Sequence, residues 1–281
     1  LHKPQKERSM IDILLDPLTY PFMQRALIMA LMIGTVCAIF SCFLILKGWS
    51  LMGDAISHAV LPGLALSYIA GIPLAIGAFG AGLCCALGIG FIKDNSRVKE
   101  DAVMGIIFSG MFALGLVMLT KIETDVHLLH ILFGNILGIT TRDMIETGVI
   151  SLLCSAIMFI KRRDFMLFCF DPAHARVIGL NTRHLNFALL ILLALTIVSA
   201  LKAAGIILVI AMLIAPGATA FLISRRFDQM LTIALITSTL SCTIGTILSY
   251  HIDTATAPLI VLIQSTFFLA ALPLKRQETS P

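Results

Sequence analysis

Long stretches without a single Asp, Glu, Lys or Arg are the dominant feature of this 281-residue sequence. Residues 26–46 form one such stretch, and residues 55–92 form another that is too long for a single membrane crossing. A transmembrane helix needs about 20 predominantly apolar residues. The sequence therefore predicts an all-α fold, a polytopic bundle of membrane-spanning helices.

The composition excludes the main soluble alternatives. Hydrophobic residues make up 58% of the chain and charged residues only 13%, whereas soluble domains average about 25% charged residues. A cytosolic enzyme, a secreted domain and a disordered chain are therefore excluded. The net charge of +4 is too small and scattered for a nucleic-acid partner. The seven cysteines are odd in number and lie mostly in apolar runs, which favours free buried thiols over disulfides or a zinc site.

Breaks between the apolar stretches predict eight or nine crossings. The sequence Gly71-Ile72-Pro73 divides residues 55–92 into two spans, because Gly and Pro together interrupt a helix. Residues 126–141 are short and contain two His, two Gly and an Asn, which predicts a re-entrant segment. The remaining predicted spans are residues 102–120, a span from about 142 to 160, and residues 185–201, 203–224, 230–252 and 254–274.

Basic residues orient these spans, because cytoplasmic loops carry an excess of Lys and Arg. The C-terminus is predicted inside and the N-terminus outside. Residues 1–25 form an N-terminal interfacial segment, residues 26–274 a single transmembrane domain with a cytoplasmic loop at 161–184, and residues 275–281 a cytoplasmic tail. The loops that set this orientation contain Lys47, Lys93, Arg97, Lys99, Lys161, Arg162, Arg163, Arg176, Arg183, Arg225, Arg226, Lys275 and Arg276.

Asp54 and His58 are the candidate metal ligands. Their i, i+4 spacing places both side chains on one helix face. A carboxylate inside a membrane is costly, so it normally faces the bundle interior or a water-filled cavity. Carboxylate and imidazole together suit Mn²⁺, Fe²⁺ or Zn²⁺, and two such helices across a dimer axis would supply four ligands. The alternative is that Asp54 caps the helix and His58 is an ordinary core histidine.

Two other features are open to a functional reading. His127 and His130, beside Glu123 and Asp125, could form an outer vestibule that gathers cations, or simply a solvated loop. The Pro-Gly pairs at 62–63 and 216–217 interrupt predicted spans, as broken helices in transporters do, or they are simple packing kinks.

The loop beginning at Asp171 predicts a short cytoplasmic helix. Asp171 is a good N-cap, Pro172 a good first helical residue and Gly179 a helix stop. A helix ordered in such a loop indicates a surface for a soluble partner, with a plain connector as the alternative. The chain contains no G-x-x-x-x-G-K-[ST] motif, so it is not predicted to bind ATP by that route.

Several of these motifs together resemble the permease family of bacterial zinc, manganese and iron ABC importers. The resemblance covers most of the chain and is nearest to the manganese/iron branch. It rests on residues 52–63, residues 99–102, residues 132–138, and the pairs Asp171-Pro172 and Gly179-Leu180.

The resemblance implies a type II ABC importer permease of the bacterial inner membrane. Its partners would be a second permease chain, an ATPase subunit, an extracytoplasmic metal-binding protein and the surrounding lipid. It implies no permanently bound cofactor and no enzymatic activity of its own, with Mn²⁺ or Fe²⁺ as cargo. Asp54 and His58 would line the metal path. The same machinery carrying Zn²⁺, and more remotely an ion-gradient-coupled secondary transporter, are the alternatives. The ATPase-coupling residues would be Asp171, Pro172, Ala175, Arg176, Gly179 and Leu180.

Overall fold

The structure is a computed structural model, and it describes residues 16–121 and 138–273. Most of the predicted re-entrant segment, with His127 and His130, lies outside these residues, as does the tail 275–281. Within the described ranges every regular element is a helix, which confirms the all-α prediction. The elements are η1 (Asp16–Thr19), α2 (Pro21–Lys47), α3 (Met52–Ala70), α4 (Leu74–Asn95), α5 (Glu100–Thr120), α7 (Thr141–Ile160), α8 (Arg162–Phe170), α9 (Pro172–Val177), α10 (Thr182–Ile223), α11 (Phe227–Ile252) and α12 (Thr256–Ala271).

Among the described residues, six helices are long and apolar enough to cross a membrane: α2, α4, α5, α7, α10 and α11. Helix α12 is also apolar but shorter. Helix α10 has 42 residues, or about 60 Å at 1.5 Å per residue, which is twice a bilayer core of about 30 Å. If α10 crosses twice and α3 and α12 also cross, the helices are consistent with the predicted eight or nine crossings.

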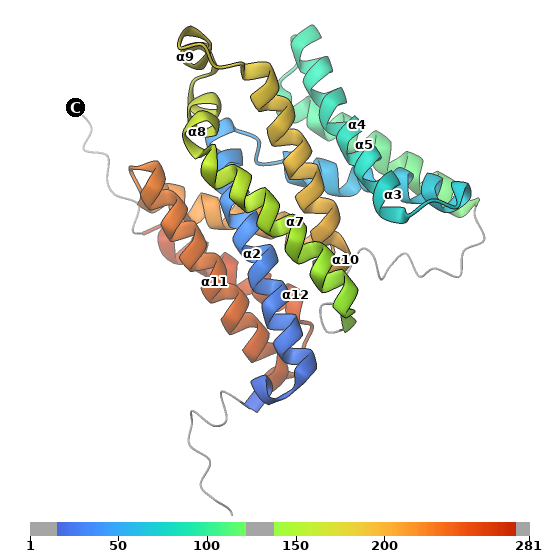
Figure 1. Cartoon of the computed structure of the whole chain (residues 1–281), viewed down its shortest axis with the longest axis vertical. Helices are drawn as coiled ribbons and strands as arrows, with labels where there is room; N and C mark the ends of the chain where they lie inside the picture. The colour runs from blue at the N-terminus through green and yellow to red at the C-terminus, as the bar shows by residue number, and fades with distance from the viewer. Residues whose placement is uncertain (1–15, 122–137, 274–281) are drawn as a thin grey trace, which may run out of the picture.

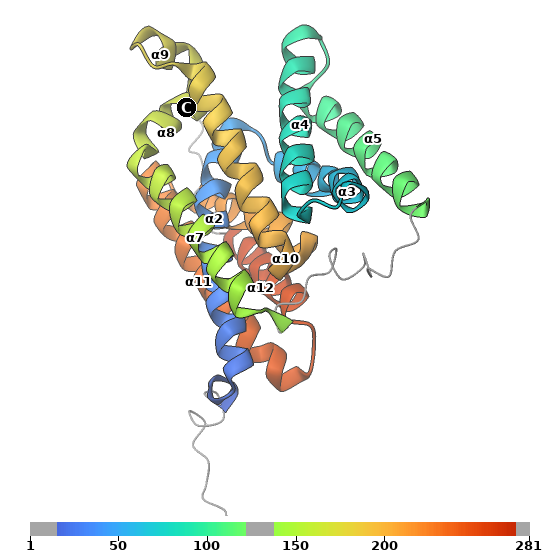
Figure 2. The ribbon, with the colours of Figure 1, turned by 45° about the vertical axis from the view of Figure 1, so that its right-hand side comes forward.

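Helix α2 occupies the centre of the larger helix group. It packs against α7, α10 and α11, and these four helices lie together in Figure 1. Phe40 and Phe43 of α2 are fully buried. Helices α3, α4 and α5 form a second group at one side, where α3 runs at a steep angle to α2 (Figures 1 and 2). The second group contains the candidate site, because Asp54 and His58 belong to α3.

The first helix begins earlier than predicted. Helix α2 starts at Pro21, five residues before the charge-free stretch that begins at residue 26. Pro21 is the first helical residue, where its missing N–H costs nothing and its fixed φ is already helical. Only η1 and Tyr20 separate α2 from the start of the described residues.

The predicted break at residues 71–73 is confirmed. Gly71 ends α3 in the left-handed region at φ 65°, and the Ile72 N–H donates to the Ser67 carbonyl at 3.1 Å. Pro73 then precedes the first residue of α4. Glycine adopts a positive φ without steric cost, which explains why the helix stops there.

The predicted break at Lys202 is wrong by three residues. The chain remains helical through Lys202 and turns at Gly205, with φ 73° and ψ 169°. This conformation is essentially restricted to glycine. A charged side chain marked the neighbourhood of the break, but backbone sterics fixed its position.

Ser41 of α2 supports the second irregular point of α10, at Pro216. Its hydroxyl donates to the Ile214 carbonyl at 3.0 Å and accepts from the Gly217 N–H at 2.8 Å. A proline inside a helix removes one backbone hydrogen bond and leaves groups that must find other partners in a membrane. The prediction that this Pro-Gly pair lies inside a span is confirmed, and α2 supplies the partner.

Candidate functional site

Asp54 and His58 lie side by side on the first two turns of α3. His58 Nε2 is 3.3 Å from Asp54 Oδ1, and the two side chains are 23% and 30% exposed. The predicted helix face is therefore real, and both groups remain partly accessible. A metal ion that approached this face would meet one carboxylate and one imidazole together.

Two phenylalanines of α5 enclose the imidazole. The ring centroids of Phe108 and Phe112 lie 5.1 and 5.2 Å from that of His58. His58 Nδ1 is buried and has no hydrogen-bond partner among the described residues. The ring is thus held by packing against α5 and by its contact with Asp54, and one of its nitrogens remains without a protein partner.

Helix capping does not explain Asp54. The N-cap of α3 is Leu51, which makes no side-chain cap hydrogen bond. Asp54 lies within the first turn, where the helix dipole favours a carboxylate, and its side chain contacts His58. The position therefore stabilises the charge of Asp54 while leaving its oxygens accessible.

Asp54 and His58 have no third candidate ligand beside them in the part of the chain that the structure describes. No group of three or more His, Cys, Asp or Glu side chains that could hold a metal ion occurs in residues 16–121 and 138–273. All seven cysteines are free, as predicted, and all except Cys84 are buried. Burial raises the pKa of the Cys169 thiol on α8 to about 12, against a smaller opposing effect of Lys47, so thiolate ligands are not offered there at neutral pH.

The short helix predicted after Asp171 is confirmed as α9. The Asp171 carboxylate accepts from the N–H groups of Ala173 and His174, both at 2.9 Å, and Pro172 is the first helical residue. Gly179 adopts φ 87° beyond its end. Ala175 is fully buried, so it faces inward and not toward a partner. The exposed side chains of this segment include His174 and Val177, which were not among the predicted ATPase-coupling residues.

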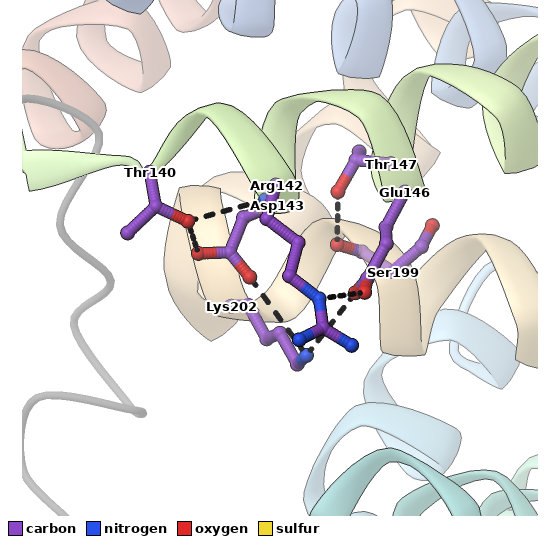
Figure 3. A network of polar contacts seen from close by, with 7 residues as sticks. All are labelled: Thr140, Arg142, Asp143, Glu146, Thr147, Ser199 and Lys202. Carbon is purple, nitrogen blue, oxygen red and sulfur yellow. Dashed lines mark hydrogen bonds and ion pairs between the residues drawn. The ribbon is translucent and has the colours of Figure 1, made fainter.

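A polar network joins the start of α7 to α10 near its break (Figure 3). Lys202 Nζ lies 3.9 Å from Asp143 Oδ1 and 3.7 Å from Glu146 Oε2. Arg142 pairs with Glu146 at 3.0 Å, and the Thr147 hydroxyl donates to the Ser199 carbonyl at 3.1 Å. From the sequence, Lys202 indicates only a break between two predicted spans. A single charged residue between two apolar stretches indicates that its side chain pairs with groups on another helix of the bundle.

The comparisons with known proteins agree with this arrangement. The family model described as "ABC 3 transport family" matches residues 19–275. The chain belongs to this family. Among its relatives, the Haemophilus influenzae "Probable iron transport system membrane protein" is 59% identical over 94% of this chain and 97% of its own length. The Synechocystis "Manganese transport system membrane protein MntB" is 52% identical over 92% and 85%.

A solved structure extends the agreement to three dimensions. "PsaBC from Streptococcus pneumoniae in complex with Fab" contains a chain that matches with a TM-score of 0.84 and 38% identity, over 95% of this chain and 98% of that chain. This ABC 3 family member therefore has the fold of an ABC permease. The expected fold class and family resemblance are both confirmed.

Proposed function

We propose that this ABC 3 family protein is the membrane subunit of an ATP-driven importer of Mn²⁺ or Fe²⁺, and that Asp54 and His58 hold the ion during passage. The observation that supports this most directly is the Asp54–His58 pair at 3.3 Å on a helix with no other charged residue. The relatives named for iron and manganese transport support the choice of cargo.

The geometry suits brief binding better than storage. Two ligands from one chain leave a divalent ion under-coordinated, and a second permease chain would bring the number to four. A carboxylate and an imidazole without thiolates bind Mn²⁺ and Fe²⁺ with moderate strength. A transport site must also release its ion. Phe108 and Phe112 fix the imidazole plane. Even a small movement of α3 relative to α5 would therefore change the ligand geometry.

The remaining parts of the proposal concern partners and orientation. Helix α9, with the segment from Asp171 to Leu180, would seat in the groove of an ATPase subunit, and an extracytoplasmic protein would deliver the ion. The coupling set stays Asp171, Pro172, Arg176, Gly179 and Leu180, with Ala175 supporting α9 from inside. The α9 end would be cytoplasmic, as would the C-terminus, with the N-terminus outside. The apolar helices and the family support an inner-membrane location for the proposed permease.

Two alternative functions can each be distinguished from this proposal by a measurement. The same machinery carrying Zn²⁺ would use the same two ligands, so only the accumulated element separates it. A secondary transporter would need no ATPase, and the capped α9 helix argues against it, because a gradient-driven transporter has no need of such a docking surface. Transport that continues after ATP depletion in the presence of an ion gradient would favour the secondary transporter.

The test is metal accumulation, measured element by element, in cells that express the complete transporter. Asp54→Ala and His58→Ala should each lower Mn or Fe accumulation by at least about tenfold, because a lost ligand to a charged cargo costs more than 1.4 kcal/mol. His251→Ala and Asp253→Ala, which alter exposed residues at the end of α11, are the matched controls and should transport normally.

Assembly must be measured alongside transport. Each variant permease should still copurify with the ATPase at the parent ratio. Uptake that survives both Asp54→Ala and His58→Ala would remove the pair from the metal path. Accumulation of zinc alone would leave the pair in place and overturn the choice of cargo.

A further inference from the structure

A pocket of about 590 Å³ lies at the end of the bundle that contains α9, apart from Asp54 and His58. It is formed where α2, α4, α8, α9 and α10 meet. Four basic side chains line it, and none of its described lining residues is acidic. These four are Lys47, Lys93, Arg176 and Arg183.

The basic groups come from four different helices, so the sequence alone would not bring them together. Lys47 is the last residue of α2, Lys93 lies in the last turn of α4, and Arg183 lies in the first turn of α10. Arg183 makes no hydrogen bond or ion pair with any residue that the structure describes, and Arg176 uses only Nε, toward the Pro172 carbonyl at 3.3 Å. Their guanidinium groups therefore keep free donors for an anion.

Apart from the polar side chains of Thr182 and Asn186, the rest of the pocket wall is mostly apolar. Leu87 and Phe91 of α4 face the pocket together with Phe187 and Leu190 of α10. Trp49 lines it as well and is 5% exposed. A pocket lined by basic groups together with apolar side chains of two membrane helices fits an amphipathic anion. Basic pockets between transmembrane helices on the cytoplasmic side are where anionic lipid headgroups bind.

We propose that this pocket binds the phosphate headgroup of an anionic membrane phospholipid, with an acyl chain against α4 and α10. The headgroup bridges Arg176 of α9 and Arg183 of α10 to the ends of α2 and α4. Lipid binding thereby links the α9 segment to the helices that pack beside α3. In the proposed function the α9 segment, which includes Arg176, seats in the ATPase, so an acidic surface of the ATPase is the competing occupant of the pocket. That surface would not use the apolar part of the wall. This inference does not depend on which metal is carried.

Trp49 is the only tryptophan of the chain, so its fluorescence reports on this pocket. The full-length permease in neutral detergent is titrated with phosphatidylglycerol or phosphatidylcholine that has brominated acyl chains, which quench tryptophan on contact. Phosphatidylglycerol should quench Trp49 saturably, with a half-saturating mole fraction at least fivefold below that of phosphatidylcholine. Inorganic phosphate at millimolar concentration should not relieve this quenching.

The double variant Arg176→Gln/Arg183→Gln should raise the half-saturating fraction of phosphatidylglycerol by about tenfold or more, since each basic residue near an anionic lipid contributes roughly 1 kcal/mol. Arg163→Gln removes the same charge from an exposed position on α8 outside the pocket and should bind like the parent. An unchanged Trp49 emission maximum without lipid shows that each variant is folded.

A second measurement uses the assembled transporter, with its ATPase, washed in detergent and analysed for retained phospholipid. The parent and Arg163→Gln should retain more phosphatidylglycerol than the double variant. Equal quenching by the two lipids, a double variant that binds like the parent, or relief by inorganic phosphate would each overturn the proposal. So would an assembled parent that retains no more lipid than the double variant, which would assign the pocket to the ATPase.

Discussion

At the scale of single residues, glycines decide how closely α3 and α4 approach. A Cβ atom on Gly77 would collide with the Gly63 carbonyl oxygen and the Ser67 hydroxyl, and one on Gly63 would collide with the Gly77 carbonyl. These contacts involve backbone, which cannot move aside as a flexible side chain can. The position of α3, and with it that of Asp54 and His58, depends on this close packing.

Gly77→Ala should therefore lower the stability of the purified permease by about 1–3 kcal/mol, the usual cost of overpacking a tight interface. Gly80→Ala is the matched control on the same helix, because nothing lies within 4 Å of a Cβ placed there. It should be neutral or slightly stabilising, since alanine favours a helix. Thermal unfolding in detergent measures both, and equal midpoints for the two variants would contradict the close-packing account.

At the scale of elements, α10 is irregular at two points, and a different neighbouring helix supports each of them. At Gly205 the backbone itself turns, and Lys202 nearby reaches the carboxylates of Asp143 and Glu146 on α7. At Pro216 the helix continues, and Ser41 of α2 bonds the adjacent carbonyl and N–H. Each irregular point is thus tied to a neighbouring helix.

Ser41→Ala should destabilise the permease by about 1–3 kcal/mol, because it leaves the Ile214 carbonyl and the Gly217 N–H without this partner inside the bundle. Ser265→Ala removes an exposed hydroxyl that bonds only within its own helix α12 and should change stability little. Thermal unfolding of both variants in the same detergent is the measurement. A Ser41→Ala protein as stable as the Ser265→Ala protein would show that Ser41 is dispensable for α10.

At the scale of the whole molecule, the connections fall at two ends. The segment from α8 to α10 lies at the same end as the connection between α4 and α5, and the start of α2 lies at the opposite end (Figures 1 and 2). The basic residues Lys93, Arg97 and Lys99 lie in or beside the α4–α5 connection, so the positive-inside rule predicts a cytoplasmic location for that end.

Single cysteines at the two ends of α4 test this orientation. In a Cys84→Ser background, which removes the exposed native thiol, Val98→Cys should react with a membrane-impermeant maleimide only in inside-out vesicles. Ile72→Cys, in the turn before α4, should react only in intact spheroplasts. Both native positions are exposed. The reverse pattern would invert the proposed orientation, and labelling of both positions from one side would show that α4 does not cross the membrane.

Local features of the sequence determined much of this protein. The charge-free stretches predicted the helices, Gly71 and Pro73 the break between α3 and α4, and Asp171 and Gly179 the limits of α9. Each of these depends on the cost of a charge in lipid or on backbone preferences within one helical turn. The i, i+4 relation of Asp54 and His58 is equally local.

Only the tertiary structure decided which distant groups meet. The packing of Phe108 and Phe112 on His58, the bonds from Ser41 to α10, and the basic pocket all join residues that are far apart in sequence. The charge of Lys202 predicted a helix break at that residue, but the break lies at Gly205. Lys202 remains in the helix because its ammonium group pairs with carboxylates of α7. The backbone conformation at the break requires a residue without a Cβ, which is Gly205. Helix periodicity fixes which face a side chain occupies, but packing of the whole bundle fixes what that face contacts.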